Sequence, residues 1–432
     1  MRTKILQLFL SAYLTYFEFL TRKTSMSNFK GQKSNMPLIL TQCVCYFTKV
    51  KLMIIVCFAL TLFISSAQTI QPAAVRTEVY LEKIKDKKIA VVANQTSTIH
   101  QTHLVDSLLS LGIKVKHIFS PEHGFRGNED AGKLVANGID ITTGLPIISL
   151  YGKNKKPKKE DLEGIEVVLF DIQDVGVRFY TYLSSLHYVM EACAEENVLL
   201  IVLDRPNPNA HSINGPILDS KFQSFVGMHP IPVVYGCTLG EMAHMINGEK
   251  WLNHGVQCPL EVIKCGNYQH NSCYTLPIKP SPNLPNALSI ALYPSLCFFE
   301  ATDISIGRGT NTPFQIIGSP LLKDSSFSFT PVSMPGASKY PKHENKKCYG
   351  SNLRDRNDDT HFSLRYLLSY YKAYPNKEKF FTNEKFFNLL AGNDILIKQI
   401  KDEVSEVDIK KSWEKDLTRY MLMRKKYLLY GL

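Results

Sequence analysis

Residues 167–182, VVLFDIQDVGVRFYTY, carry the strongest structural signal in the chain, because four apolar residues lead directly into Asp171 and a run of polar and aromatic side chains. A short apolar run of this kind predicts a buried β-strand. The apolar spacing that follows predicts a helix over residues 183–196 and another strand over residues 198–203. A strand, a helix and a second strand in this order predict a parallel sheet with right-handed crossovers.

Three further stretches repeat the layout of an apolar run that leads into a polar cluster. They are residues 116–127 (KHIFSPEHGFRG), 199–209 (LLIVLDRPNPN) and 297–314 (CFFEATDISIGRGTNTPF). In α/β proteins, ligands bind just outside the carboxyl ends of parallel strands, on the loops that follow them. We therefore expect these clusters to converge on one cleft.

The length of the chain and a change of character near residue 325 predict two domains. A chain of 432 residues is too long for one ordinary hydrophobic core. Residues 325–341 are rich in Ser and Pro, and beyond them helical patterns cover residues 362–373, 383–390 and 409–428. We predict an α/β catalytic domain over residues 68–325 and a smaller, mostly helical α+β domain over residues 326–432.

The net charge of +11 does not by itself indicate a nucleic-acid partner, because most of it lies near the N-terminus. Residues 1–67 hold eight Lys or Arg and one acidic residue, which leaves a net charge of only +4 for the rest of the chain. The basic run at residues 153–159 (KNKKPKK) contains a proline, and we expect it to be a solvated loop. We expect no nucleic-acid partner.

The basic N-terminal region is better explained as a leader. Lys49 and Lys51 precede the apolar residues 52–64 (LMIIVCFALTLFI), and small residues follow. These are the three parts of a secretory signal peptide. As a helix the apolar core would span roughly 20 Å, which is less than the about 30 Å of a bilayer core. We expect a signal peptide within residues 1–67, no stable membrane anchor after cleavage, and a periplasmic or secreted protein; a membrane anchor is the alternative.

The cysteines beyond the leader do not predict a disulfide framework. Seven remain there, an odd number at irregular spacing. Cys258, Cys265 and Cys273 lie close together in sequence, but no paired-ligand spacing typical of zinc accompanies them. We expect buried free thiols and no metal, with one disulfide inside this group as the alternative.

The cluster at residues 120–127 is the sharpest candidate for catalysis. Pro121 ends the predicted strand, so Glu122 and His123 follow its carboxyl edge. A carboxylic acid in a partly dry cleft has a raised pKa and can donate a proton near neutral pH. Glu122 is therefore a candidate acid/base; the alternative is a surface loop in which Glu122 pairs with Arg126.

Residues 171–182 offer acids, a cation and aromatic rings. Asp171 and Asp174 are candidates for metal ligands, a general base or helix caps. Arg178 offers a fork for a carboxylate, and Tyr180 and Tyr182 offer aromatic faces, which together suit a sugar acid. The alternative for Arg178 is to neutralise Asp174.

The loop at residues 204–209 is held by two prolines. Asn207 supplies an amide that can bond hydroxyl groups, and Asp204 and Arg205 begin the same loop. Two interpretations of this loop are possible: it contacts the substrate, or it is a structural turn.

The last cluster combines Glu300 with a Gly-Arg-Gly-Thr turn at residues 307–310. Backbone N–H groups and the guanidinium of Arg308 can hold an anion there. The chain lacks the sequence motifs of a P-loop, a zincin or a serine hydrolase with a nucleophile elbow. Those three enzyme classes therefore lose their usual support.

Taken together, the clusters resemble the exo-acting β-N-acetylmuramidases of bacterial cell-wall turnover. The matching segments, in order, are SPEHGFRG, FDIQDVGVRFYTY, LDRPNP, GPILD, PVVYGCTLGEM, PSPNLP, the FE…GRGTNTPF stretch and RKKYLLY. They extend over roughly residues 78–432. Ala301 and Asp303 depart from the family pattern, in which Gly and Asn are expected.

The resemblance implies a Rossmann-like N-terminal domain, a smaller C-terminal domain and a cleft between them. It implies an enzyme without a cofactor that removes terminal N-acetylmuramic acid (MurNAc) from the non-reducing end of peptidoglycan fragments. Glu122 matches the family's active-site Glu and is the expected acid/base. Glycoside hydrolysis needs a second group, for which Asp171, Asp174 and Glu300 are the candidates.

In such an enzyme His123, Tyr180 and Tyr182 would bind or orient the sugar, and Arg126, Arg178 or Arg308 would hold its lactyl carboxylate. Asp204, Arg205 and Asn207 are further candidates for substrate binding, from the loop that they form. Two alternatives of other classes stay open. One is a non-catalytic muropeptide-binding protein of the cell envelope, and the other is a metal-dependent hydrolase that uses His123, Asp171 and Asp174. Release of free MurNAc from a MurNAc-GlcNAc disaccharide would distinguish the glycosidase from the binding protein.

Overall fold

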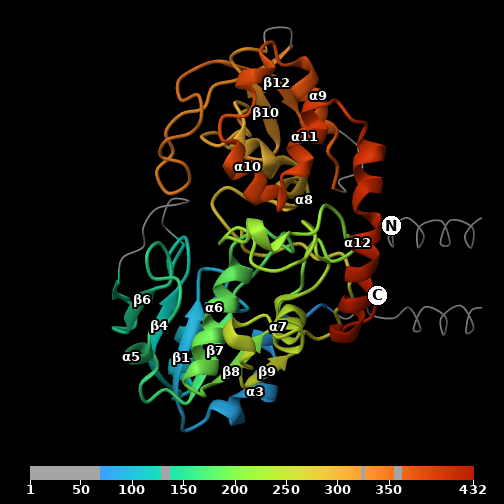
Figure 1. The fold of residues 1–432 in the computed structure, drawn as a ribbon. Coiled ribbons are helices and arrows are strands. Elements are labelled where there is room, and N and C mark those ends of the chain that lie inside the picture. Colours follow the sequence, from blue (N-terminus) through green and yellow to red (C-terminus); the bar gives the residue numbers. More distant parts are fainter. Residues whose placement is uncertain (1–68, 128–136, 323–325, 355–361) are drawn as a thin grey trace, which may run out of the picture. The chain divides into compact units, whose positions relative to one another are not determined.

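The structure, a computed structural model, describes residues 69–127, 137–322, 326–354 and 362–432 (Figure 1). Residues Thr69–Leu432 form one compact unit. The predicted signal peptide at residues 1–67 lies outside the described residues. Within the described ranges, none of the helices has both the length and the apolar character needed to span a membrane.

A seven-stranded sheet forms the centre of the first part of this unit, in the order β5-β6-β4-β1-β7-β8-β9. All neighbouring strands are parallel except β5, which is antiparallel to β6. The strands are β1 (Lys88–Ala93), β4 (Lys114–Ser120), β5 (Gly138–Ile139), β6 (Pro146–Ser149), β7 (Val167–Asp171), β8 (Leu199–Leu203) and β9 (Leu260–Ile263). A separate two-stranded ladder pairs β2 (Thr98–Ile99) with β3 (Thr102–His103).

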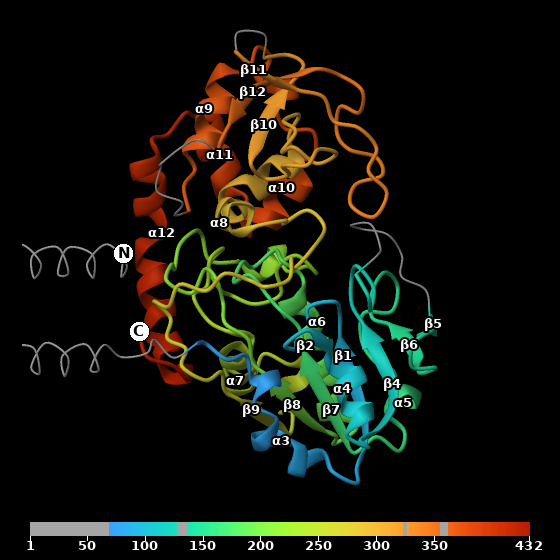
Figure 2. The ribbon, with the colours of Figure 1, turned by 180° about the vertical axis from the view of Figure 1, so that it is seen from behind.

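Helices cover both faces of this sheet, which confirms the predicted α/β class. Val92 of β1 and Phe170 of β7 belong to the core shared with α6 (Tyr182–Glu195) and α7 (Leu239–Gly248). Val91 and Leu169, the adjacent residues on the same strands, belong to the core shared with α3 (Thr77–Ile84) and α4 (Leu104–Ser110). Successive side chains of a strand point to opposite faces, so a strand buried on both faces is apolar throughout. Figure 1 views the face that carries α6 and α7, and Figure 2 views the opposite face.

The second part of the unit combines helices with a small antiparallel sheet. This sheet has the order β10-β12-β11, with β10 (Ile316–Ser319), β11 (Phe327–Phe329) and β12 (Cys348–Asn352). Its helices are α8 (Ala287–Leu296), α9 (Arg365–Ala373), α10 (Glu384–Ala391), α11 (Ile395–Lys401) and α12 (Glu406–Arg424). The domain boundary predicted after residue 325 falls between β10 and β11, and the division into domains stays a prediction.

Short helical pieces complete the architecture. The four-residue helix α5 spans Lys159–Leu162. The 3₁₀ segments are Ala73–Val75, Ser220–Phe222, Asn253–Gly255, Cys297–Ala301, Lys377–Lys379 and Lys425–Tyr427. The segment Cys297–Ala301 matters for the site, because it carries Glu300.

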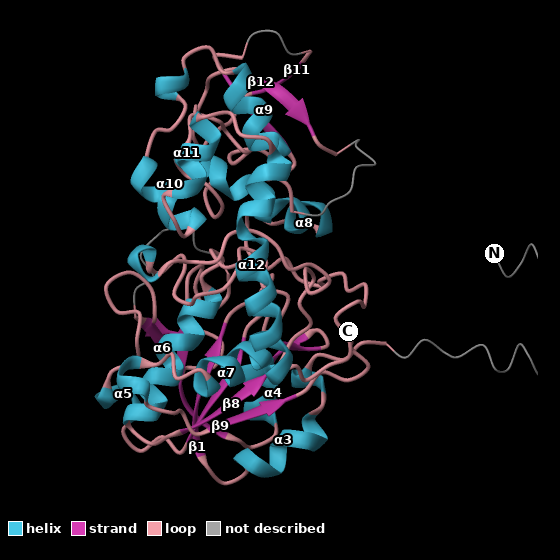
Figure 3. Ribbon diagram, turned by 45° about the vertical axis from the view of Figure 1, so that its right-hand side comes forward, coloured by secondary structure: helices cyan, strands magenta, loops and turns pink. Residues whose placement is uncertain are grey.

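Helix α12 ties the second part of the unit to the first (Figure 3). The hydroxyl of Tyr420 donates to the carbonyl of Tyr235 at 2.6 Å, and the guanidinium of Arg424 donates to the carbonyl of Gly236. The tail after α12 continues the connection, since the Tyr430 hydroxyl bonds the carboxylate of Asp204 at 2.6 Å. The chain terminus is thus anchored at the end of β8.

Candidate active site

A cavity of about 770 Å³ opens beyond the carboxyl ends of β4, β6 and β7. Glu122, Tyr151 and Thr181 line it from the loops that follow these strands, and Glu300 and Arg308 line it from the second part of the unit. Its volume falls within the range of about 300–1,000 Å³ that is usual for small-molecule sites. The cavity therefore brings together three of the four sequence clusters, those at residues 116–127, 167–182 and 297–314.

Strand register explains why Tyr151 lies beside Glu122. In the parallel pair β4–β6, Ser120 is the partner of Ser149, so Glu122 and Tyr151 each follow two residues beyond a matched position. The Tyr151 hydroxyl donates to Oε1 of Glu122 at 3.1 Å, and the Thr181 hydroxyl donates to Oε2 at 3.3 Å. Two neutral hydroxyl groups thus orient the carboxyl group of Glu122. Neither Tyr151 nor Thr181 is among the site residues predicted from the sequence, although Tyr151, like Glu122, follows the end of a strand.

Arg126 does not pair with Glu122. Its guanidinium bonds Asp106 at 3.1 Å and Asp140 at 2.8 Å instead. The turn between them bends at His123, whose φ of +73° is in the left-handed region, and this bend separates Glu122 from Arg126 along the loop. The structure therefore places Arg126 in an ion-pair group outside the set of residues that line the cavity.

Glu300 and Arg308 form an ion pair in the cavity wall. The Nη2 and Nε atoms of Arg308 lie 2.6 and 2.8 Å from Oε1 of Glu300. Burial lowers the pKa of Arg308, but the charge and hydrogen bonds of Glu300 outweigh burial and raise it. The guanidinium also lies 5.1 Å over the ring of Phe314. Arg308 is thus a fixed positive charge beside a carboxylate.

A recess of about 80 Å³ adjoins the cavity and shares Glu122, Phe179, Thr181, Tyr293 and Arg308 with it. Its other lining residues are His123, Tyr180, Tyr182, Ser281, Asn283, Leu284 and Phe314. The predicted sugar-binding residues His123, Tyr180 and Tyr182 therefore lie at the edge of the same site. Residues 281–284 and Tyr293 come from the proline-rich stretch and α8, and the sequence analysis assigned them no role in the site.

Comparison with known proteins decides the family. Residues 89–288 match the family model described as exo-β-N-acetylmuramidase NamZ, N-terminal, and residues 291–430 match its C-terminal counterpart. The chain belongs to the NamZ exo-β-N-acetylmuramidase family. A Bacillus subtilis protein named peptidoglycan β-N-acetylmuramidase NamZ is 37% identical over 374 residues, which are 81% of this chain and 89% of that protein.

Solved structures show the same fold as this NamZ family member. A crystal structure of a DUF1343 family protein from Bacteroides fragilis is 44% identical, with a TM-score of 0.78. A second DUF1343 family protein from the same organism is 28% identical, with a TM-score of 0.70. Each comparison covers 84% of this chain and 99% of the solved chain.

Asp171 lies outside the lining of the cavity in this NamZ family member. Asp171 is fully buried. The Arg205 guanidinium donates two hydrogen bonds to its carboxylate, from Nε to Oδ1 at 2.6 Å and from Nη2 to Oδ2 at 2.8 Å. A bidentate pair of this kind fixes the loop after β8 against the end of β7. The catalytic role of Asp171 and the sugar contact of Arg205 stay predictions, and neither residue lines the cavity.

Asp174 and Arg178 are also buried away from the cavity lining. Oδ2 of Asp174 accepts hydrogen bonds from the Gly176 N–H and from the Tyr235 hydroxyl, and burial raises the pKa of Asp174 to about 7. Arg178 does not neutralise Asp174: its guanidinium donates to the four carbonyls of Pro216, Ile231, Leu390 and Ala391. Burial lowers the pKa of Arg178 to about 9. The Arg178 side chain thus joins the two parts of the unit.

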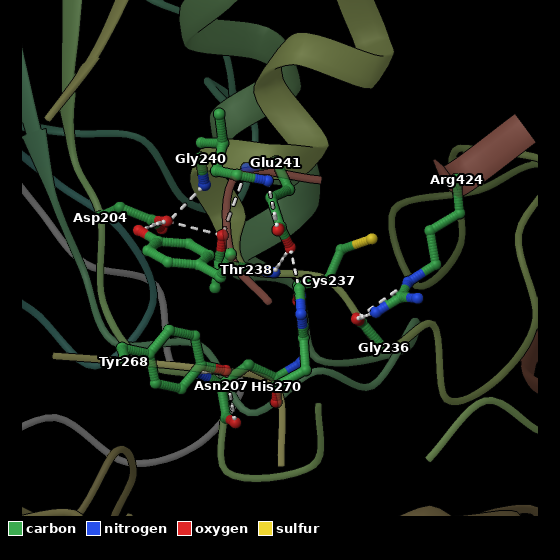
Figure 4. Close-up of polar contacts among 12 residues, drawn as sticks. Asp204, Asn207, Gly236, Cys237, Thr238, Gly240, Glu241, Tyr268, His270 and Arg424 are labelled. Atoms are coloured by element: carbon green, nitrogen blue, oxygen red, sulfur yellow. Dashed lines mark hydrogen bonds and ion pairs between the residues drawn. The ribbon is translucent and has the colours of Figure 1, made fainter. Parts of the chain in front are cut away.

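Asp204 and Asn207 belong to a buried polar network (Figure 4). Asp204 accepts hydrogen bonds from the Thr238 hydroxyl at 2.6 Å and the Gly240 N–H at 2.9 Å, and the Asn207 amide donates to the Cys237 carbonyl. Glu241, which forms a capping box with Thr238, lies 2.9 Å from Nε2 of His270. The predicted substrate contacts of Asp204 and Asn207 are not tested by this arrangement, but both side chains are occupied by the protein.

The alternative of a metal-dependent hydrolase requires His123, Asp171 and Asp174, and these three side chains have different partners. His123 lines the recess, Asp171 pairs with Arg205, and Asp174 bonds Tyr235. In the described part of the chain, no group of three or more His, Cys, Asp or Glu side chains is placed to hold a metal ion. The seven cysteines of this part are all free thiols, and Cys273 alone among them is exposed.

Proposed function

We propose that this protein is an exo-acting β-N-acetylmuramidase that releases terminal MurNAc from the non-reducing end of peptidoglycan fragments during cell-wall turnover. The observation that carries the proposal is the placement of two carboxyl groups, Glu122 and Glu300, in the lining of one cavity. Membership of the NamZ family and the name of the Bacillus subtilis relative support the same activity. Glycosidases generally use a pair of carboxyl groups that flank the scissile bond.

The surroundings of the two carboxyl groups suit different roles. Glu122 accepts hydrogen bonds from the Tyr151 and Thr181 hydroxyls, which orient its carboxyl group at the cavity, and we assign it the transfer of a proton to the leaving-group oxygen. Glu300 is ion-paired with Arg308, which fixes it in the cavity wall, and we assign it the second role, in which a carboxyl group stabilises or attacks the anomeric centre or activates water.

The cations of the cavity suit the lactyl carboxylate that distinguishes MurNAc from other amino sugars. Arg308 and Lys339 line the cavity, whereas Arg126 and Arg178 are bonded elsewhere. An Arg guanidinium binds carboxylates in a planar, directed geometry. Arg308 is therefore the proposed partner of the lactyl carboxylate, and Lys339 adds positive charge at the cavity wall.

The proposed location is the periplasm or the exterior of the cell. Peptidoglycan fragments arise outside the cytoplasmic membrane, and the basic flank and apolar core at residues 49–64 fit a signal peptide. N-terminal sequencing of the exported protein tests this. A mature chain that begins before residue 40 would rule out the signal peptide.

Incubation with MurNAc-GlcNAc disaccharide tests the activity, with free MurNAc and GlcNAc followed by chromatography. Hydrolysis should yield one equivalent of each, and longer fragments should lose MurNAc only from the non-reducing end. Glu300→Gln should abolish most of this turnover while MurNAc still binds. Binding of the disaccharide without any cleavage by the wild-type protein would instead favour a muropeptide-binding protein.

A further inference from the structure

The recess beside the cavity holds a buried hydroxyl group that the protein leaves unused. Tyr180 is 8% exposed and lines the recess. Its hydroxyl oxygen is buried, and no group in the described part of the chain meets it with the geometry of a hydrogen bond, although the hydroxyls of Ser281 and Tyr182 are close neighbours. Burying a polar group without a partner is costly, so an unsatisfied hydroxyl that faces a hollow points to a ligand that completes it.

Apart from His123, Glu122 and Arg308, the side chains that line the recess carry no charge, and they combine apolar with polar groups. Aromatic and aliphatic walls come from Phe179, Leu284, Tyr293 and Phe314, and neutral polar groups come from Tyr180, Ser281 and Asn283. The charged Glu122 and Arg308 are shared with the main cavity, so they stand where the two spaces meet. Such walls favour a small group with one apolar end and one neutral hydrogen-bonding end.

The geometry is held in place before any ligand arrives. The ring of Tyr180 packs edge-on against Tyr182 with centroids 4.9 Å apart, and the Asn94 amide donates to the Tyr182 hydroxyl at 2.9 Å. The side-chain amide of Asn283 donates to the carbonyl of Ala337 at 2.8 Å, which fixes its orientation. Preorganised groups lose little conformational entropy on binding, so each hydrogen bond to the ligand contributes more to the affinity.

We propose that this recess receives the 2-acetamido group of the terminal sugar, and that the Tyr180 hydroxyl donates a hydrogen bond to the acetamido carbonyl oxygen. The inference rests on the proposed muramidase activity, and it adds Tyr180 as the residue that recognises the N-acetyl substituent. A volume of about 80 Å³ accommodates a group of a few heavy atoms but not a pyranose ring. The lactyl carboxylate stays at the junction, where Arg308 supplies its counter-charge. Burial raises the pKa of Tyr180 well above its usual value, so the hydroxyl remains a donor at any physiological pH.

The test compares two substrates in two variants. The substrates are MurNAc-GlcNAc and the matching disaccharide whose muramyl residue lacks the N-acetyl group. Tyr180→Phe should lower kcat/KM for the acetylated substrate roughly 3- to 10-fold, the loss expected for one hydrogen bond, and leave the deacetylated substrate unchanged. Because the hydroxyl makes no well-formed hydrogen bond to the described part of the chain, the variant should fold normally.

Tyr151→Phe is the matched control. It also removes one tyrosine hydroxyl from the site, but one that bonds Glu122 rather than the recess. It should slow both substrates by a similar factor, so the preference for the acetylated substrate stays as in the wild type. A Tyr180→Phe enzyme with the wild-type preference would overturn the proposal.

Binding measurements separate this inference from the proposed activity. Calorimetric titration with free MurNAc and with muramic acid does not depend on turnover. Tyr180→Phe should weaken MurNAc binding several-fold and leave muramic acid binding unchanged. A wild-type protein that binds with this selectivity but never cleaves the disaccharide would contradict the muramidase function alone, whereas cleavage with an unaltered selectivity in Tyr180→Phe would contradict the N-acetyl recess alone.

Discussion

The cavity around Glu122 and the network around Asp204 begin from the same sequence layout and end differently. Both acids follow a buried parallel strand, β4 for Glu122 and β8 for Asp204. Glu122 meets two hydroxyl groups at the lining of an open cavity. Asp204 is fully buried and accepts hydrogen bonds from Thr238, Gly240 and Tyr430.

The difference arises from what the rest of the chain brings to each strand end. At β8, the capping box that begins α7 and the C-terminal tail close over Asp204. Beyond β4, Glu122 lines a cavity, and Glu300 and Arg308 from the second part of the unit line the same cavity. A polar cluster at a strand end is therefore a site only where tertiary structure leaves room for a ligand.

The largest expected effect is a loss of turnover when Glu122, at the cavity, is substituted. Glu122→Gln should lower kcat for MurNAc-GlcNAc by roughly 10²- to 10⁴-fold, because it removes the proton donor but keeps the shape. Thermal unfolding should stay within a few degrees of the wild type, since one of the two hydroxyls can still donate to the amide oxygen and the other can turn to accept from the amide nitrogen. Steady-state kinetics and a melting curve measure both. Turnover near the wild-type level would remove Glu122 from the mechanism.

Substitution of the buried Asp204 should have the reverse effect, with a large loss of stability and little change in substrate binding. Asp204→Ala leaves buried donors on Thr238, Gly240 and Tyr430 without an acceptor, which should cost about 3–5 kcal/mol of unfolding free energy. Denaturant unfolding measures this loss. The remaining folded protein should keep a KM close to that of the wild type, because Asp204 does not line the cavity. A stable Asp204→Ala protein with a raised KM would instead give Asp204 the substrate contact that the sequence predicts.

The sequence predicts the fold well because its signals are local. The strands predicted over residues 167–170 and 198–203 appear as β7 and β8. Glu300 and Arg308 were likewise found from a local turn pattern. Which clusters stay open was not predictable, because it depends on distant partners. One partner of Asp204 is Tyr430, 226 residues away, and Arg178 bonds Leu390 and Ala391.

A smaller effect of pH should come from a histidine pair behind the cavity wall. Phe225 lines the cavity, and His229 on the same loop is buried with its Nε2 3.0 Å from Nδ1 of His187. Burial lowers the pKa of both histidines, while Glu191 raises and Lys156 lowers that of His187.

The sign of this effect follows from which state binds protons more readily. A histidine whose pKa is lowered by folding contributes its stability fully above about pH 6.5, the ordinary value, and loses it as the pH falls toward the folded value. The loss approaches about 1.4 kcal/mol per pH unit for each proton taken up on unfolding. His229→Gln should flatten the fall in unfolding free energy between pH 6.5 and 5. Asp174 and Asp204, whose raised pKa values act in the opposite direction, are common to both proteins and cancel in the difference. Parallel profiles for the two proteins would show that the pair does not couple to folding.

The smallest expected effect lies at the mouth of the cavity, on the loop between β11 and β12. Tyr340 lines the cavity and is 80% exposed, an unusual position for a large aromatic ring. The loop is braced at its base, where the Val332 N–H donates to the Gly309 carbonyl at 2.8 Å and Lys342 donates to the carbonyls around Glu300. An exposed ring on a braced loop offers a flat apolar face to the sugar next to MurNAc.

Tyr340→Ala should therefore raise KM for MurNAc-GlcNAc about 3-fold, which corresponds to roughly 0.6 kcal/mol of lost contact, and leave kcat unchanged. Inhibition by free MurNAc, which lacks the second sugar, should not change. Val332→Ala is the matched control, because Val332 is 46% exposed on the same loop but does not line the cavity. If Tyr340→Ala weakens inhibition by free MurNAc as much as it raises KM, the ring contacts the terminal sugar, and the cavity mouth belongs with Glu122 and Arg308 rather than with the leaving group.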